Sequence, residues 1–236
     1  MKRQRLGQHY LVSEEVVDLM VREAAIGPGE RVLEIGTGKG ALTRKLFSAA
    51  DAFEGFEVDT ANFKETADAI PGVRGSLHRE DAFRTKPSFD VLVSSLPYSQ
   101  SANFIGWLGQ RTFKRAVVLL QSDFAAKATS APGTRDYRAV SALTQICFDV
   151  TIPHKVPRTA FDPRPRVDSV VLSIKPRLTL SASQISWVRR FFSLRRQSVP
   201  AALKKLGIAP RLEYGGRRVY SLTPAEVVSL CPAAGR

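Results

Sequence analysis

Hydrophobic positions in the first half of the chain fall into short apolar runs separated by amphipathic stretches. The runs have the length of buried strands, and the stretches repeat apolar residues at helical spacing. Strands are expected at 32–35, 53–58, 73–79, 89–95 and 116–120, and helices at 14–24, 41–49, 60–69 and 101–108. Strands that alternate with helices indicate a mostly parallel sheet with helices on both faces, so the expected fold class is α/β.

The pattern changes after about residue 130. It predicts an exposed loop at 133–137, a helix at 138–148, and an antiparallel strand pair at the sheet edge, formed by 150–156 and 167–174. From Leu178 the chain becomes helical and strongly basic. We therefore expect a larger α/β domain at 1–177 and a small C-terminal helical domain at 178–236.

Charge and composition narrow the class of partner. The 236 residues include 35 Lys and Arg against 22 Asp and Glu, and the resulting net charge of +13 favours a polyanion such as nucleic acid. Two distant cysteines and three histidines without ligand spacing predict neither a disulfide framework nor a metal site. Without a long apolar run or a signal-peptide core, we expect a cytoplasmic protein that does not associate with membranes.

A glycine-rich turn follows the first strand, in Arg31-Val-Leu-Glu-Ile-Gly-Thr-Gly-Lys-Gly-Ala-Leu-Thr43. Its third glycine comes one position earlier than in the dinucleotide fingerprint, which favours an adenosine-type ligand over a pyrophosphate. Glu57 ends the next strand at the distance where an acidic side chain can bind ribose hydroxyls. Taken alone, the turn is equally compatible with an ordinary glycine-rich loop.

Two later strand ends carry further candidate residues, because ligands of open α/β sheets bind beyond the carboxyl ends of the strands. Asp81 follows the third strand and could accept a hydrogen bond from an adenine amine, or it could be a solvated loop carboxylate. Ser95-Leu-Pro-Tyr98 places a polar acceptor, a rigid proline and an aromatic ring at the end of the fourth strand. This is a site for a planar base, or a turn with a packed tyrosine.

Four motifs occur in the order seen in ribosomal RNA adenine N6-dimethyltransferases. They are Gly7-Gln-His-Tyr-Leu11, Glu34-Ile-Gly-Thr-Gly38, Ser95-Leu-Pro-Tyr98 and Phe161-Asp-Pro-Arg-Pro-Arg-Val-Asp-Ser169. The chain resembles the small-subunit enzymes most closely, with the erythromycin-resistance methylases as relatives, over about Arg3 to Ile174. The first and last motifs are specific to this family, whereas the glycine loop is shared by most class I methyltransferases.

The resemblance implies a class I, Rossmann-like enzyme that uses S-adenosyl-L-methionine (SAM) to methylate adjacent adenines of small-subunit rRNA in ribosome biogenesis. It places the cofactor on His9, Leu11, Gly36, Gly38, Glu57, Asp81, Ala82 and Ser95. It places the target base on Ser95, Leu96, Pro97 and Tyr98, with Phe161 stacking on the other side. We expect a monomer that binds small-subunit rRNA, or the immature subunit, through basic helical residues that include Arg195, Arg196, Lys204 and Lys205.

Two positions depart from the family's pattern. Ser95 stands where the family has asparagine, and His9 stands where it usually has asparagine. Serine keeps an acceptor oxygen on a shorter side chain, which predicts slower transfer or a block after the first methyl group, while an imidazole can still donate to the cofactor.

The sequence leaves two other functions open and disfavours a third. The first is an rRNA-binding assembly factor that has lost catalysis. The second is a large-subunit rRNA adenine methylase that gives macrolide resistance. A nicotinamide-dependent dehydrogenase fits poorly, because the third glycine is early and a substrate domain is lacking.

Overall fold

The computed structural model describes residues 9–232, so Gly7 and Gln8 of the first motif lie outside the described residues. The chain forms two compact units. The first holds the residues up to Phe104 together with Thr112–Asp123 and Thr151–Lys175. The second holds Ile105–Arg111, Phe124–Val150 and the chain from Pro176 onward. The expected division into two domains at Arg177 stays a prediction.

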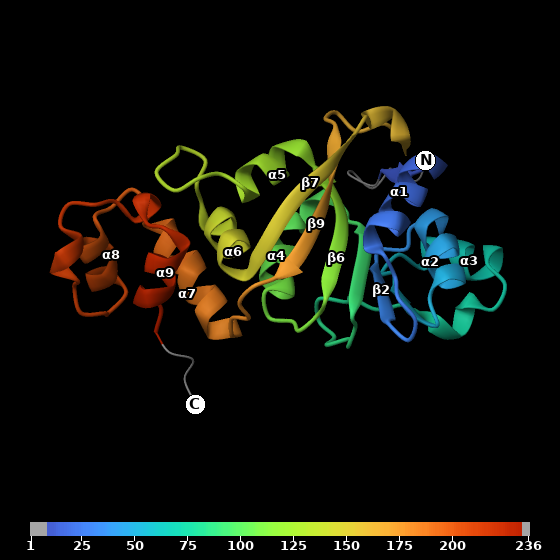
Figure 1. The fold of residues 1–236 in the computed structure, drawn as a ribbon, viewed down its shortest axis with the longest axis horizontal. Coiled ribbons are helices and arrows are strands. Elements are labelled where there is room, and N and C mark those ends of the chain that lie inside the picture. The colour runs from blue at the N-terminus through green and yellow to red at the C-terminus, as the bar shows by residue number, and fades with distance from the viewer. Residues whose placement is uncertain (1–8, 233–236) are drawn as a thin grey trace. The chain divides into compact units, whose positions relative to one another are not determined.

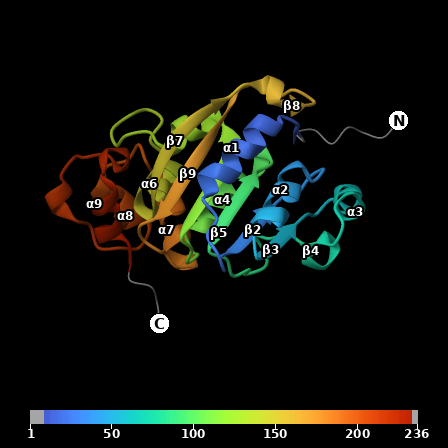
Figure 2. The same ribbon diagram turned by 45° about the vertical axis from the view of Figure 1, so that its right-hand side comes forward.

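A seven-stranded sheet has the order β4-β3-β2-β5-β6-β9-β7. Figure 1 labels four of its strands, β2, β6, β9 and β7. Its first five strands in this order pair in parallel, and β9 pairs antiparallel with β6. β9 and β7 lie side by side at the edge, where a strand pair was expected (Figure 2). The strands are β2 (Arg31–Ile35), β3 (Ala52–Phe56), β4 (Leu77–His78), β5 (Val91–Ser95), β6 (Arg115–Gln121), β7 (Phe148–Val156) and β9 (Ser169–Pro176).

Three helices of the first unit begin at predictable positions. α1 (Glu14–Ala24) begins after Ser13, whose hydroxyl accepts the Val16 N–H, and it packs against β5 and β6. α2 (Ala41–Ala49) follows the glycine turn and packs against α1 and β3. α3 (Thr60–Ala69) begins after Asp59, whose carboxylate accepts two backbone N–H groups of the first turn.

A second, two-stranded sheet ties the N-terminal segment down. In it β1 (Tyr10–Leu11) pairs antiparallel with β8 (Phe161–Asp162), with Leu11 opposite Phe161. The Val12 N–H also donates to the Ala160 carbonyl at 2.9 Å. These contacts dock the N-terminal segment on the chain at 160–162.

The second unit is helical. α6 (Ala139–Cys147) packs against α7 (Ala182–Ser193) and α9 (Pro224–Leu230). Aromatic rings fill the space between them: Trp187 stacks on Phe191 with 4.7 Å between ring centroids, and Phe192 meets Tyr137 edge-on at 5.5 Å. Two helices, α4 (Ser101–Leu108) and α5 (Ser122–Ala128), begin in the first unit and end in the second. The second unit also contains α8 (Val199–Lys205), η4 (Leu212–Tyr214) and η5 (Val219–Ser221), and the first unit contains the 3₁₀ turns η2 (Tyr98–Gln100) and η3 (Arg158–Ala160).

Two expectations about local structure were wrong in part. The third strand shrinks to Leu77–His78, because Val73–Ser76 forms a 3₁₀ turn, η1, after Gly72. The segment 133–137 is not wholly exposed, since Tyr137 is fully buried against Phe192. Among residues 9–232, the structure contains no helix whose length and apolarity would allow it to span a membrane.

Candidate active site

The glycine turn needs glycine at three positions because their φ angles are positive. Gly36, Gly38 and Gly40 have φ of 77°, 55° and 82°. The turn is held in place by backbone hydrogen bonds, from Gly36 N–H to the Phe56 carbonyl at 2.7 Å and from Gly40 N–H to the Thr37 carbonyl at 2.9 Å. It therefore presents bare, fixed backbone to a ligand at the carboxyl end of β2.

Glu57 joins this turn to the end of β3. One of its carboxylate oxygens accepts the Gly38 N–H at 2.9 Å, and the other accepts the Asp59 N–H at 2.8 Å. Each carboxylate oxygen has a second lone pair, so the anchored group can still accept hydrogen bonds from a ligand. Asp81, after β4, is held similarly, because its carboxylate accepts the Phe83 N–H at 3.0 Å.

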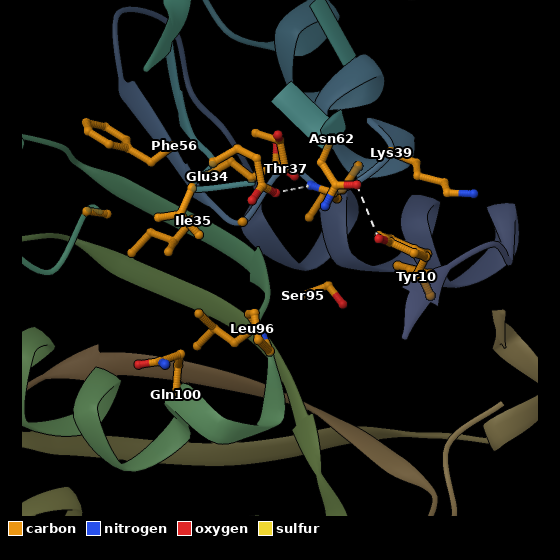
Figure 3. Close-up of a pocket in the computed structure, with 18 of the residues that line it drawn as sticks. Tyr10, Glu34, Ile35, Thr37, Lys39, Phe56, Asn62, Ser95, Leu96 and Gln100 are labelled. Atoms are coloured by element: carbon orange, nitrogen blue, oxygen red, sulfur yellow. Dashed lines mark hydrogen bonds between the residues drawn. The ribbon is translucent and has the colours of Figure 1, made fainter. Parts of the chain in front are cut away.

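A cavity of about 510 Å³ lies at this edge of the sheet, in the size range of small-molecule and cofactor sites. Figure 3 shows part of its wall, with Ser95 between Leu96 and Tyr10. All predicted cofactor residues line it, and so do three of the four predicted base-binding residues at the end of β5 and just beyond: His9, Leu11, Gly36, Gly38, Glu57, Asp81, Ala82, Ser95, Leu96 and Pro97.

The two predicted stacking rings do not line this cavity. Tyr98 is half-buried, and its hydroxyl and that of Ser169 lie 2.9 Å apart in a hydrogen bond. Its ring lies beside that of His9, with 5.5 Å between centroids. Phe161 is 3% exposed and belongs to the hydrophobic core, because it is the inward residue of β8 opposite Leu11. Stacking of a base between both rings stays a prediction, and it requires Phe161 to leave this core.

Ser95 has a free acceptor. It ends β5, and its hydroxyl has no hydrogen-bond partner among the described residues. The neighbouring Ser94 instead points into the sheet and donates to the Ile35 carbonyl at 2.5 Å. The alternation of a strand thus directs one serine into the core and the next into the cavity.

Glu34 is a cavity residue that the sequence analysis named only as part of a motif. Its side chain is 1% exposed, and one carboxyl oxygen is buried without a partner among the described residues. Burial raises the pKa of this carboxyl to about 8, so Glu34 is mostly protonated at neutral pH. A buried strand position occupied by a glutamate was the signal that could have identified it.

Tyr10, Asn62 and Lys39 also line the cavity and were not predicted. The Tyr10 hydroxyl donates to the Asn62 side chain at 3.2 Å, and the Lys39 ammonium lies 5.0 Å from the centre of the Tyr10 ring (Figure 3). A Cβ at Gly38 would approach the same ring to 3.4 Å. Tyr10 therefore packs directly against the glycine turn and holds β1 beside it.

The predicted RNA-binding residues lie in the second unit. Lys204 and Lys205 are exposed in the last turn of α8, and Arg196 is exposed just before this helix. Arg195 has a structural contact, because its guanidinium donates to the Arg135 carbonyl at 3.3 Å. Within residues 9–232, no three or more His, Cys, Asp or Glu side chains gather in a group that could hold a metal ion.

Two solved structures share the fold of this chain. A dimethyladenosine transferase from Plasmodium falciparum matches with a TM-score of 0.77 at 24% identity, over 94% of this chain and 96% of that one. The 23S rRNA methyltransferase ErmE matches with a TM-score of 0.63 at 23% identity, over 94% and 97%. The fold is therefore that of a Rossmann-like methyltransferase, with its cavity at the carboxyl ends of the parallel strands.

Sequence relatives identify the family within this class. The family model described as ribosomal RNA adenine dimethylase matches residues 1–232. A probable ribosomal RNA small subunit methyltransferase A from Pyrococcus abyssi is 33% identical over 237 residues, which cover 94% of this chain and 88% of that protein. The chain belongs to the ribosomal RNA adenine dimethylase family and is an rRNA adenine methyltransferase, which confirms the resemblance read from its motifs.

Proposed function

We propose that this protein methylates N6 of adjacent adenosines in small-subunit rRNA, with SAM as methyl donor, during assembly of the small ribosomal subunit. The main support for the proposal is that the glycine turn, Glu57 and Ser95 line one cavity in a member of this family. As part of the same proposal, the protein acts as a cytoplasmic monomer and uses no metal.

The described residues fit the cofactor. The cavity is large enough for an adenosine with an amino-acid tail, and the positive φ angles of its glycine turn let a ligand approach the backbone. When bound, SAM supplies an activated methyl group on a sulfonium. In our proposal, Glu57 accepts hydrogen bonds from the ribose hydroxyls, Asp81 and Ala82 border the adenine, and His9 and Leu11 cover the ligand.

The reacting group of the substrate is a poor nucleophile, because the lone pair of the adenine amine is delocalised into the ring. The Ser95 hydroxyl oxygen accepts one N–H of this amine, and a backbone carbonyl of the Ser95–Tyr98 segment accepts the other. Both hydrogen bonds favour a pyramidal nitrogen with an available lone pair. Fixing that nitrogen in line with the methyl group can supply several kcal/mol of barrier reduction. Transfer would break the bond between the methyl group and the sulfonium and leave a neutral thioether. The methylated amine would be strongly acidic and would lose its extra proton to water, so no general base is needed.

Transfer of labelled methyl groups tests the proposal. Purified protein is incubated with labelled SAM and with immature small subunits or large subunits in separate reactions. We expect label in the small-subunit rRNA. Label in large-subunit rRNA alone would instead assign the chain to the resistance-type methylases, and no label with either substrate would contradict the proposal.

Ser95 motivates a second candidate function, an rRNA-binding assembly factor with weakened or lost catalysis, because the family has asparagine there. Calorimetry with SAM separates the two. The proposed enzyme binds SAM, whereas a pure binding factor shows rRNA affinity without measurable affinity for SAM.

A further inference from the structure

A second hollow, of about 710 Å³, lies in the first unit and shares no lining residue with the cavity of the candidate active site. It is formed by the start of α5, the end of β7 and the segment that leads into β9. Three cationic side chains line it, Lys155, Arg158 and Arg166, and all three are exposed. No binding role was predicted from the sequence for any of these three cations.

Among residues 9–232, these cations have no carboxylate partner of the kind that structural arginines elsewhere in this chain have. Arg115 pairs with Glu30, and Arg217 pairs with Glu226 at 2.6 Å. Lys155, Arg158 and Arg166 form no ion pair with any residue of the 9–232 range. Their charges are therefore available to an external anion.

The hollow also contains two carboxylates, and one of them is used by the fold. Asp168 accepts the backbone N–H of Arg158 at 3.0 Å, and its carbonyl accepts both the N–H and the hydroxyl of Ser122 at 3.0 and 2.9 Å. The other, Asp123, lies in the first turn of α5, where a negative charge is favourable. These contacts fix the backbone of the hollow, so the three cations are carried by an ordered wall.

The position of the hollow indicates what binds there. Asp168 is followed directly by Ser169, whose hydroxyl is hydrogen-bonded to that of Tyr98 at 2.9 Å. The same 157–168 segment carries Phe161. An anion in the hollow would thus lie beside the residues proposed to hold the target base, and the anions next to a target base in RNA are its neighbouring phosphates.

We propose that Lys155, Arg158 and Arg166 form a phosphate-binding site for the rRNA strand that carries the target adenosines. The site rests on the proposed function and adds to it a contact surface in the catalytic unit, separate from the basic helices of the second unit. Each cation neutralises one phosphate. For single-stranded RNA, each such contact contributes about 0.7 to the slope of log affinity against log salt concentration.

Salt titration of rRNA binding tests the site. The probe is protein-free small-subunit rRNA, and the variants are Lys155→Gln, Arg158→Gln and Arg166→Gln, singly and together. We expect weaker binding, with the salt slope reduced by about 0.7 in each single variant and by about 2 in the triple variant. Arg158→Lys with Arg166→Lys should keep the wild-type slope, because phosphate contacts need charge rather than a guanidinium.

Lys175→Gln is the matched control, since this exposed lysine lies at the other end of β9 and loses one charge in the same unit. An equal loss in the control and in Arg158→Gln would refute a defined site. Wild-type slope in the triple variant would also refute it. Normal binding to free rRNA with weaker binding to intact subunits would assign the hollow to an acidic protein segment and overturn the RNA assignment. Failure of the proposed function would give a different result from failure of the phosphate site. In that case the wild-type protein would transfer no methyl group to the small subunit.

Discussion

Because Glu34 is buried and protonated, we expect the free energy of unfolding to depend on pH. Burial raises the pKa of its carboxyl from 4.5 to about 8, so between these pH values the folded state keeps a proton that the unfolded state has released. Under these conditions the free energy of unfolding falls as pH rises, by about 1.4 kcal/mol per pH unit for one proton. The contribution of the protonated Glu34 carboxyl to the free energy of unfolding is fully present below pH 4.5 and is lost progressively up to about pH 8.

The Glu34→Gln variant removes this dependence. Glutamine resembles the protonated carboxyl in shape and carries no charge at any pH. Since the two pKa values of the carboxyl differ by 3.5, the wild-type protein should lose up to about 5 kcal/mol relative to the variant between pH 4.5 and pH 8. The variant should therefore be about as stable as the wild type at pH 5 and clearly more stable at pH 8.

Urea unfolding at pH 5, 6, 7 and 8 measures this difference directly. Glu65→Gln, on the exposed side of α3, is the control and should follow the wild-type curve. If Glu34→Gln and the wild type instead give parallel stability curves over this range, the reasoning about the buried carboxyl is wrong.

Three further predictions concern the site, the sheet and the RNA surface. Ser95→Ala should lower kcat at least about tenfold, because one acceptor for the adenine amine is lost, while Ser95→Asn should raise the yield of dimethyladenosine. Single-turnover assays check both variants. Wild-type rates in Ser95→Ala would contradict the proposed hydrogen bond from the amine to Ser95. Gly55→Ala should destabilise the protein by about 1–3 kcal/mol in urea unfolding, because its Cβ would lie 2.8 Å from Leu77 and 2.9 Å from Thr37, whereas Gly75→Ala, with open space around it, should change little. Charge reversal at Arg195 and Arg196, or at Lys204 and Lys205, should weaken rRNA binding and leave SAM affinity intact. Unchanged rRNA binding in both double variants would show that these residues are not part of the RNA-binding surface.

Local signals explain which elements could be predicted from the sequence. Asp59 caps α3 and Ser13 caps α1, so both helices begin where a capping side chain precedes an amphipathic stretch. The glycine turn and Glu57 could be connected because the carboxyl ends of adjacent parallel strands meet at one edge. The cavity at this edge brings together all the predicted cofactor residues.

Long-range packing explains what could not be predicted. Tyr137 lies in a stretch with turn residues, and its burial depends on Phe192, which is 55 positions away. Phe161 belongs to a motif rich in prolines and charged residues, and its pairing with Leu11 across two short strands brings the ring into the core. The hollow with Arg158 and Arg166 likewise depends on Ser122 meeting Asp168, a contact that no local pattern encodes.

Mass spectrometry of small-subunit rRNA, after incubation of the protein with SAM and immature small subunits, tests the proposed methylation directly. We expect N6-methylated adenosine at two adjacent positions, with dimethyladenosine increased by Ser95→Asn. Unmodified adenosines throughout the small-subunit rRNA, or methyl groups on a different base or atom, would contradict it.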